Sequence, residues 1–187
     1  MYSGYFSNPF IFLIDILFGL YLAVIALRLI MQWVEWSHHN PLVQFIVGVT
    51  QKPVQILRKF IPSIGRLDTA TLVLLFVVEL CKLLLIGLIQ PQLFEMSLIR
   101  LALTDLFSLF ITLYSASIII EAVLSWITPN SYDNPAIAFT HKMNAPLLTP
   151  IRQRLPVIGG LDLSPLVVFL GLQILSMLVL PLLTGKV

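Results

Sequence analysis

Charged residues are scarce in this chain. Of its 187 residues, 11% are charged and 58% are hydrophobic, which is far from the usual composition of a soluble domain. The single cysteine, Cys81, excludes a disulfide framework and a cysteine-based metal site. The composition therefore predicts an integral membrane protein.

Catalytic and cofactor motifs are also lacking. The chain has no HExxH pattern, no Gly-rich phosphate loop and no Ser–His–Asp spacing. Its histidines, His38, His39 and His141, lie outside the long apolar stretches, so a transmembrane haem with histidine ligands is not expected. We predict a protein that is not an enzyme, has no cofactor or metal and does not bind nucleic acid directly. A metal or pH-sensing pair at His38-His39 is the less favoured alternative.

Four long apolar stretches are present instead, at residues 9–33, 69–89, 98–126 and 163–183. Each is long enough to cross a bilayer, which takes roughly 20 residues of helix. The first has no basic segment before it and no small-residue cleavage site after a short apolar core, so we interpret it as a retained helix. The sequence predicts an all-α membrane protein with four transmembrane helices.

The chain repeats itself with a period of half its length. A repeat of this size indicates duplication of a whole structural unit, here residues 1–92 and 93–187, each with two of the apolar stretches. The matching positions lie 94 residues apart: Asn40 and Asn134, Arg58 and Arg152, Pro62 and Pro156, Gly65 and Gly159, Asp68 and Asp162.

Basic residues are concentrated in the two loops within the repeats. The N-terminal tail and the connection at residues 90–97 have no Lys or Arg. The positive-inside rule therefore places both loops in the cytoplasm and both termini in the periplasm of a bacterial inner membrane, with the two repeats parallel. The basic loop residues are Lys52, Arg58, Lys59, Arg66, Lys142, Arg152 and Arg154.

Each loop has the pattern of an amphipathic helix. In the first loop, Leu42, Phe45, Ile46 and Val49 follow helical spacing and predict one apolar face. With Lys and Arg on the other side, such a segment is expected to lie in the headgroup plane or to re-enter the protein. Three prolines predict that each loop is broken into two short helices: Pro53 in the first loop, Pro146 and Pro150 in the second.

A proline–glycine–aspartate element closes each loop. Pro62 and Pro156 are expected to stop the amphipathic helix, and Gly65 and Gly159 to allow a turn. Asp68 and Asp162 then cap the next apolar helix through its free N–H groups, with a ligand or ion site there as the alternative.

Each half resembles the YggT family repeat. The resemblance rests on R-L-I-M-Q-W at residues 28–33 and A-P-L-L-T-P-I-R-Q-R-L-P-V-I-G-G-L-D-L-S-P at residues 145–165. It implies a small bacterial or plastid membrane protein. Similar proteins are linked to ion homeostasis in osmotic stress, to cytochrome complex assembly in plastids and to cell division or nucleoid organisation, and the resemblance supplies no catalytic residues. The copies differ where Glu121 stands opposite Arg28.

Six charged residues fall inside the apolar stretches beyond their first turns. An unpaired charge in hydrocarbon costs at least ~2.5–3.5 kcal/mol, so these residues need partners, water or a function. Glu79 and Lys82 can pair within one helix, and Asp15 and Asp105 are expected to reach the interface. Because Arg28 and Glu121 are expected at the same depth, we predict that they pair and tie the two halves together. The alternative is that Arg28 reaches the headgroups while Glu121 faces water or a partner.

Two function classes follow from these features. The first is a non-enzymatic assembly, scaffold or homeostasis factor, as a single chain or a homo-oligomer, whose basic loops bind another membrane protein or anionic lipid. The alternative is an ion transport or channel component that uses the buried charges. The candidate binding residues in the loops are Arg58, Lys59, Arg152 and Arg154.

Overall fold

Each apolar stretch of the sequence forms one long helix. The computed structural model describes residues 9–34, 39–63, 68–95, 97–127, 134–155 and 162–185. In this part of the chain, four helices are long and apolar enough to cross a membrane, and no strand is present. The four predicted spans are confirmed as helices, namely α1 (Pro9–Trp33), α3 (Thr69–Ile89), α4 (Leu98–Ile127) and α6 (Ser164–Thr184).

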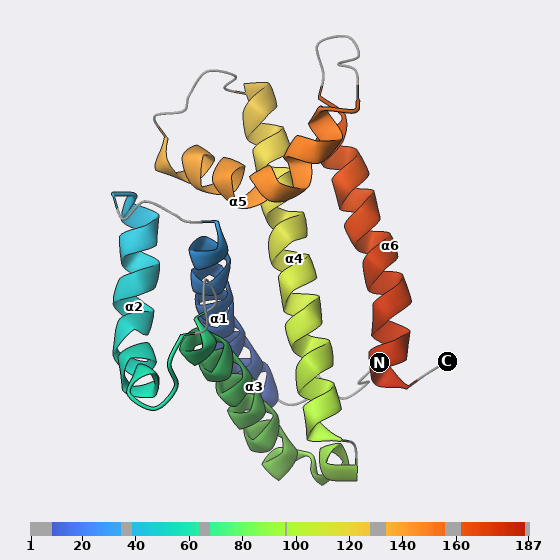
Figure 1. Cartoon of the computed structure of the whole chain (residues 1–187). Coiled ribbons are helices and arrows are strands. Elements are labelled where there is room, and N and C mark those ends of the chain that lie inside the picture. Colours follow the sequence, from blue (N-terminus) through green and yellow to red (C-terminus); the bar gives the residue numbers. More distant parts are fainter. Residues whose placement is uncertain are drawn as a thin grey trace.

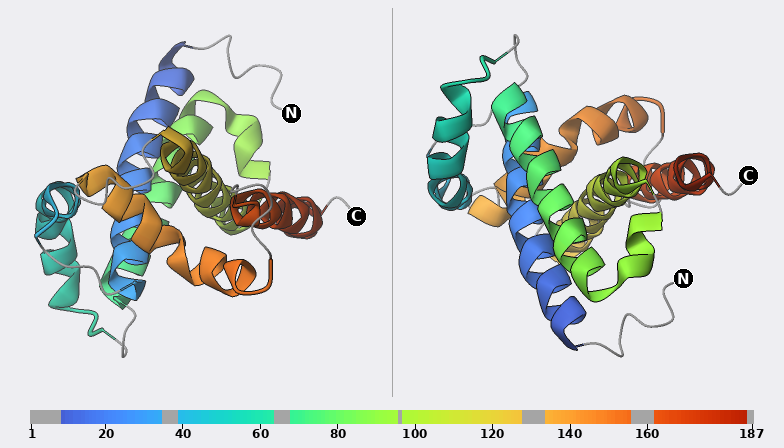
Figure 2. Two further views of the ribbon diagram at one scale, coloured as in Figure 1. Left: turned by 90° about the horizontal axis from the view of Figure 1, so that it is seen from above. Right: turned by 90° about the horizontal axis from the view of Figure 1, so that it is seen from below.

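The long helices pair within each half of the chain. α1 packs against α3, α4 packs against α6, and α3 also contacts α4 (Figure 1). Seen from above, α4 and α6 are viewed nearly end-on, whereas α1 is viewed from the side (Figure 2). The two helix pairs are therefore steeply inclined to each other. The short helix η2 (Pro91–Glu95) joins them.

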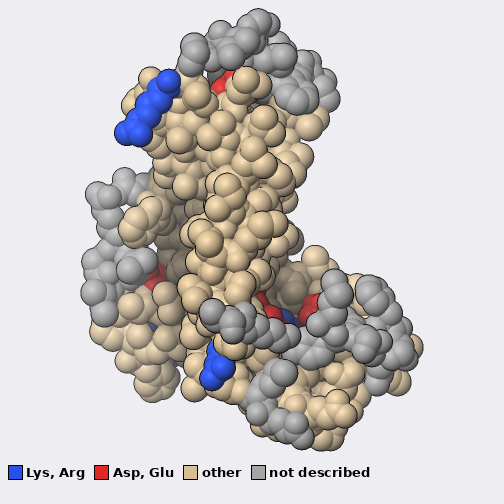
Figure 3. Space-filling model, turned by 90° about the vertical axis from the view of Figure 1, so that its right-hand side faces the viewer, with Lys and Arg blue, Asp and Glu red and all other residues tan. Residues whose placement is uncertain are grey.

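Apolar clusters hold the first pair of long helices together. One of them joins α1, α3 and the first loop helix, and another fills the opposite end of α1 and α3 and reaches η2 and α4. α6 differs, because its apolar side chains beyond the first turn are all at least partly exposed. An apolar helix without a polar face suits a lipid environment. Figure 3 shows a broad face of the molecule on which charged atoms are few.

The loop helices begin alike in both repeats. α2 (Pro41–Arg58) and α5 (Pro135–Arg152) each have proline in the first turn and asparagine at the N-cap. The side chain of Asn40 accepts a hydrogen bond from the Leu42 N–H at 2.8 Å, and Asn134 accepts one from the Ala136 N–H at 2.9 Å. The repeated Asn-Pro pair thus sets the start of both helices.

The prediction that prolines divide each loop into two helices is wrong. α2 continues through Pro53, and α5 continues through Pro146 and Pro150. An internal proline removes one backbone hydrogen bond and bends the helix without necessarily ending it. α5 accordingly changes direction along its length as it crosses α4 below its end and approaches the start of α6 (Figure 1).

The predicted apolar face of α2 is divided between two environments. Ile46 is buried with Val43 and Val54, whereas Leu42, Phe45 and Val49 are exposed. The four residues do lie along one side of a single continuous helix, as predicted, but only Ile46 packs against the protein. The rest of this side is not covered by the described part of the chain.

Candidate functional site

One ion pair recurs in both repeats. Arg58, at the end of α2, contacts Asp68, just before α3, with an Nη2–Oδ2 distance of 2.6 Å. Arg152, at the end of α5, contacts Asp162, just before α6, with an Nε–Oδ2 distance of 2.7 Å. We call these pairs the loop clamps. Each fixes the end of a loop helix to the start of the following long helix.

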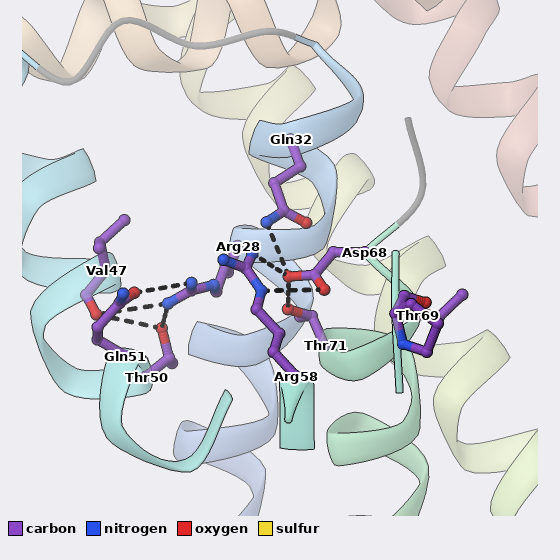
Figure 4. Close-up of polar contacts among 10 residues, drawn as sticks. Arg28, Gln32, Val47, Thr50, Gln51, Arg58, Asp68, Thr69 and Thr71 are labelled. Carbon is purple, nitrogen blue, oxygen red and sulfur yellow. Dashed lines mark hydrogen bonds and ion pairs between the residues drawn. The ribbon is translucent and has the colours of Figure 1, made fainter. Parts of the chain in front are cut away.

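Asp68 is the most heavily bonded residue of the first clamp. Its carboxylate also accepts hydrogen bonds from Gln32 at 3.0 Å and from the Thr71 hydroxyl at 2.6 Å (Figure 4). Burial alone would raise the pKa of Asp68, but the hydrogen bonds from Arg58, Thr71 and Gln32 outweigh it and hold the pKa well below its usual value. Asp68 is therefore a fixed negative charge.

The expected helix cap differs between the repeats. Asp68 occupies the N-cap position of α3, but its side chain makes no hydrogen bond to the helix backbone. The capping prediction is wrong at Asp68, because Arg58, Gln32 and Thr71 take its oxygens. Asp162 does accept a bond from the Ser164 N–H at 2.9 Å. Burial raises the pKa of Asp162, but the bonds from Ser164 and Arg152 lower it overall.

The residues of the predicted closing turn are only partly described. The carbonyl oxygen of Pro62 accepts a hydrogen bond from the Thr69 hydroxyl at 2.6 Å, which ties the end of the first loop to α3. Gly65, Pro156 and Gly159 lie outside the described residues. The turn itself therefore stays a prediction.

Arg28 points from α1 into α2. Its guanidinium donates to the Thr50 hydroxyl at 2.7 Å, to the Gln51 side-chain oxygen at 2.9 Å and to the Val47 carbonyl at 3.5 Å (Figure 4). All three acceptors are uncharged. Arg28 is thus buried with neutral partners from the loop helix of its own repeat.

Glu121 occupies the matching place between α4 and α5. Its carboxylate accepts hydrogen bonds from Asn144 at 2.8 Å and from Arg152 at 3.1 Å, and His141 Nδ1 lies 3.0 Å from it. Glu121 therefore joins the second loop clamp. Burial lowers the pKa of Arg152, but its bonds to Asp162 and Glu121 raise it overall.

The predicted ion pair between Arg28 and Glu121 is wrong. Each side chain turns to the loop helix of its own repeat, and the acceptors and donors there sit at matching positions, Thr50 with Asn144 and Val47 with His141. Spacing from the tryptophans predicts equal depth but not the direction in which a side chain leaves its helix. The charge reversal is satisfied locally, so neither residue ties the halves together.

The remaining intramembrane charges form one group across three helices. Lys82 Nζ lies 2.7 Å from Glu79, 3.4 Å from Asp105 and 3.8 Å from Asp15. The predicted pair of Glu79 and Lys82 is present. Asp15 and Asp105 both contact Lys82 while staying partly exposed, and the expectation that they reach the interface stays a prediction. This group links α1 and α3 of the first repeat to α4 of the second.

The four predicted binding residues divide into two kinds. Arg58 and Arg152 belong to the loop clamps, so their charges are already paired. Lys59 and Arg154 are exposed, and neither forms an ion pair with a described residue. In the same part of the chain, no group of histidine, cysteine and carboxylate side chains is arranged to hold a metal ion.

Sequence reasoning missed the uncharged members of these networks. Thr50 and Asn144 are fully buried polar side chains on otherwise apolar helix faces, and they occupy matching positions. A polar residue repeated on the inner face of both loop helices was the available signal. Gln32 and Thr71 lack such a match, so nothing in the sequence marks them.

Similarity to known proteins agrees with this architecture. The family model CCB3/YggT matches twice, over residues 7–89 and 101–183, which confirms the internal repeat. An uncharacterized protein of Pseudomonas aeruginosa, PA0392, is 39% identical over 173 residues, covering 91% of this chain and 87% of that protein. An uncharacterized protein in the proC 3'region of Vibrio alginolyticus is 37% identical, covering 91% and 93%. YggT of Escherichia coli K12 is 31% identical, covering 91% and 88%.

No solved structure matches the chain. The two family matches together include α1 and α3, all but the ends of α4 and α6, and both loop clamps. The chain therefore belongs to the CCB3/YggT family of membrane proteins.

Proposed function

We propose that this protein is a non-enzymatic assembly or scaffold factor of the bacterial inner membrane. Its two loop helices hold another membrane protein or anionic lipid at the cytoplasmic surface. The osmotic phenotype implied by the resemblance then arises through the bound component and not through catalysis. Both termini lie in the periplasm, as the loop charges favour.

The loop clamps are the observation that carries this proposal. In both repeats an Arg–Asp pair fixes the loop helix to the long helix that follows it. A helix held in this way presents its exposed residues in a constant position, which lowers the entropic cost of binding a partner. The built-in rigidity of α2 and α5 thus suits a scaffold better than a flexible connection would.

Lys59 and Arg154 supply the charge for such a contact. They follow the ends of α2 and α5, beside the clamps, and both are exposed. A basic residue near an anionic membrane surface contributes about 1 kcal/mol to attraction. Two such residues, one per repeat, favour acidic lipid headgroups or an acidic segment of a membrane protein.

The test replaces Lys59 and Arg154 with Gln together. We expect the variant to insert and fold normally but to retain less phosphatidylglycerol after purification and to lose co-purifying membrane proteins. Arg100→Gln is the matched control, because Arg100 is exposed in the first turn of α4, at the end of that helix away from the loop helices. Equal lipid retention and equal co-purification in the double variant and the control would contradict the proposal.

The intramembrane charge group supports a second candidate, a role in ion movement. One cation, Lys82, lies among three carboxylates, and two of these, Asp15 and Asp105, are partly exposed. The excess negative charge attracts cations or protons. Proteoliposomes that contain only this protein would take up potassium or protons, and Asp105→Asn would reduce the uptake. Absence of flux from the wild-type protein removes this candidate and leaves the first unaffected.

A further inference from the structure

The two repeats contact each other through different surfaces: the second repeat contributes residues of α5, and the first contributes residues of α1 and α2. Phe139 and Met143 of α5 insert into a cluster formed by the first repeat. We call these two side chains the inserting face. The receiving face consists of Ile30 and Met31 of α1 and Val43 and Ile46 of α2.

The first repeat has its own copy of the inserting face, and it is uncovered. Phe45 matches Phe139, yet Phe45 is 62% exposed and Phe139 only 8%. Val49 matches Met143, and Val49 is exposed while Met143 is buried. The same position of the repeat is thus an interior residue in one copy and a surface residue in the other.

The second repeat has a copy of the receiving face, and it is partly uncovered. Val123 matches Ile30, and the exposed fraction rises from 4% at Ile30 to 41% at Val123. Ile137, the match of the buried Val43, is half-buried, whereas Thr140, the match of Ile46, is itself buried. Among the described residues, each chain therefore has one uncovered inserting face and one partly uncovered receiving face.

The long helices show the same difference. Phe110 and Leu113 of α4 pack against the clusters of the first repeat. The matching residues of α1, Leu17 and Leu20, are exposed. The first repeat therefore has exposed apolar residues on both α1 and α2 at positions whose matches are packed in the second repeat.

A hydrogen bond between the repeats follows the same rule. The side-chain amide of Asn40, beside the receiving face, donates to the carbonyl oxygen of Pro135, at the start of the inserting helix, at 2.8 Å. The matching donor is the Asn134 side chain, which is exposed, and the matching acceptor is the carbonyl of Pro41. Within the described part of the chain, the Asn134 side chain and the Pro41 carbonyl do not form a hydrogen bond with each other.

We propose that a second copy of this chain covers these surfaces. The inserting face of one copy, Phe45 and Val49, enters the receiving face of another copy at Val123 and Ile137, and Asn134 donates to the partner copy's Pro41 carbonyl. The contact repeats the one already present within the chain. Because the contact joins two different faces, it is a head-to-tail contact. Copies are therefore added until the rotation between them closes a ring, and the smallest such ring has two copies.

A second copy fits these surfaces better than lipid alone does. The loop-side parts of the two surfaces include a hydrogen-bond donor, Asn134, and an acceptor, the Pro41 carbonyl, at the positions that match Asn40 and Pro135. Within a membrane, helix association depends on such packing and polar contacts, because apolar burial against lipid provides little. The inserting and receiving faces already contact each other once within the chain, and each has a matching copy elsewhere in the chain.

The test joins cysteines across the proposed contact in a background with Cys81→Ser. One tagged copy carries Phe45→Cys and a differently tagged copy carries Ile137→Cys. We expect oxidation of the co-expressed copies to give a disulfide-linked species containing both tags. The matched control pairs Phe45→Cys with Leu178→Cys, because Leu178 lies on α6 and is more exposed than Ile137, so access alone would favour the control. It should give no such species.

A mass measurement completes the test. We expect the wild-type protein in mild detergent to have at least twice the 21.0 kDa mass of one chain, and Phe45→Asp to reduce it to a single copy with unchanged helix content. A single-copy mass for the wild type contradicts the proposal. A disulfide that forms only between two Phe45→Cys copies also contradicts the proposal. Quenching of Phe45→Trp by brominated lipid as complete as that of Leu178→Trp would assign the surface to lipid instead.

Discussion

The local pairing of Glu121 can be measured against the rejected pairing with Arg28. Two double-mutant cycles share Glu121→Gln, one combined with Arg152→Gln and the other with Arg28→Gln. Glutamine keeps the size of the side chain but removes the charge. A cycle reports a coupling energy only for residues that contact each other or share partners.

The structure sets the expected size of each coupling. Arg152 donates to Glu121 at 3.1 Å, and the Glu121 side chain is 6% exposed. A hydrogen bond between charged groups contributes about 1.5–3 kcal/mol. Arg152 is partly exposed and keeps Asp162 as a second partner, so we expect a coupling of about 1–2 kcal/mol. Arg28 and Glu121 share no hydrogen-bonding partner, so their coupling should stay within about 0.3–0.5 kcal/mol of zero.

The assay is reversible unfolding in mixed micelles, followed by far-ultraviolet circular dichroism, for the wild type, the single variants and both double variants. Arg28→Gln should destabilise the protein by itself, since Thr50 and Gln51 lose a charged donor. A coupling for Arg28 and Glu121 as large as that for Arg152 and Glu121 would refute the local arrangement. Additivity in both cycles would refute the contribution of the second loop clamp.

Three further results are expected. The folded-state pKa of Asp68 is well below its ordinary value of 3.8, so its contribution to stability is full above that pH and is lost as the pH falls from there through the folded-state value. Thermal unfolding from about pH 7 to about pH 2 should show this loss begin below about pH 4 in the wild type and a flatter profile in Asp68→Asn. Lys82→Met leaves three carboxylates without their cation and should lower the free energy of unfolding by roughly 3–5 kcal/mol, whereas an unchanged value would show that the carboxylates are already neutral. In intact cells of a Cys81→Ser strain, a membrane-impermeant thiol reagent should label cysteine at Gln92 but not at Ser63, and the reverse pattern would overturn the proposed topology.

The spans were predictable because each depends on local composition. α1 and α3 have the bounds expected from their apolar runs, Pro9–Trp33 and Thr69–Ile89. The loop clamps also left a trace in the sequence, since Arg58 and Asp68 recur with identical spacing in the second repeat. Spacing that is kept between two copies of a loop is a usable signal of contact.

Direction around a helix axis was not predictable in the same way. Arg28 and Glu121 lie at matching positions, but depth alone does not reveal which neighbour a side chain meets. The exposed arc of α2 was not predictable for the same reason. Phe45 and Ile46 are both apolar, but Ile46 is buried and Phe45 is exposed, and only the position of the neighbouring helices decides this difference. Continuation of α5 through Pro146 likewise depends on packing against α4 and α6, not on the proline.

The opposite charges at Arg28 and Glu121 also act as a sorting signal between duplicated parts. If α5 settled against α1, Arg28 would lose its acceptor at Gln51, because the matching residue, Ala145, has no polar side-chain atom. If α2 settled against α4, the Glu121 carboxylate would face the Val47 carbonyl oxygen, and neither group could donate a hydrogen bond to the other. Each loop helix is therefore rejected by the wrong pair of long helices. A chain built from two similar halves can in this way insert into the membrane, and meet copies of itself, without exchanging its loops.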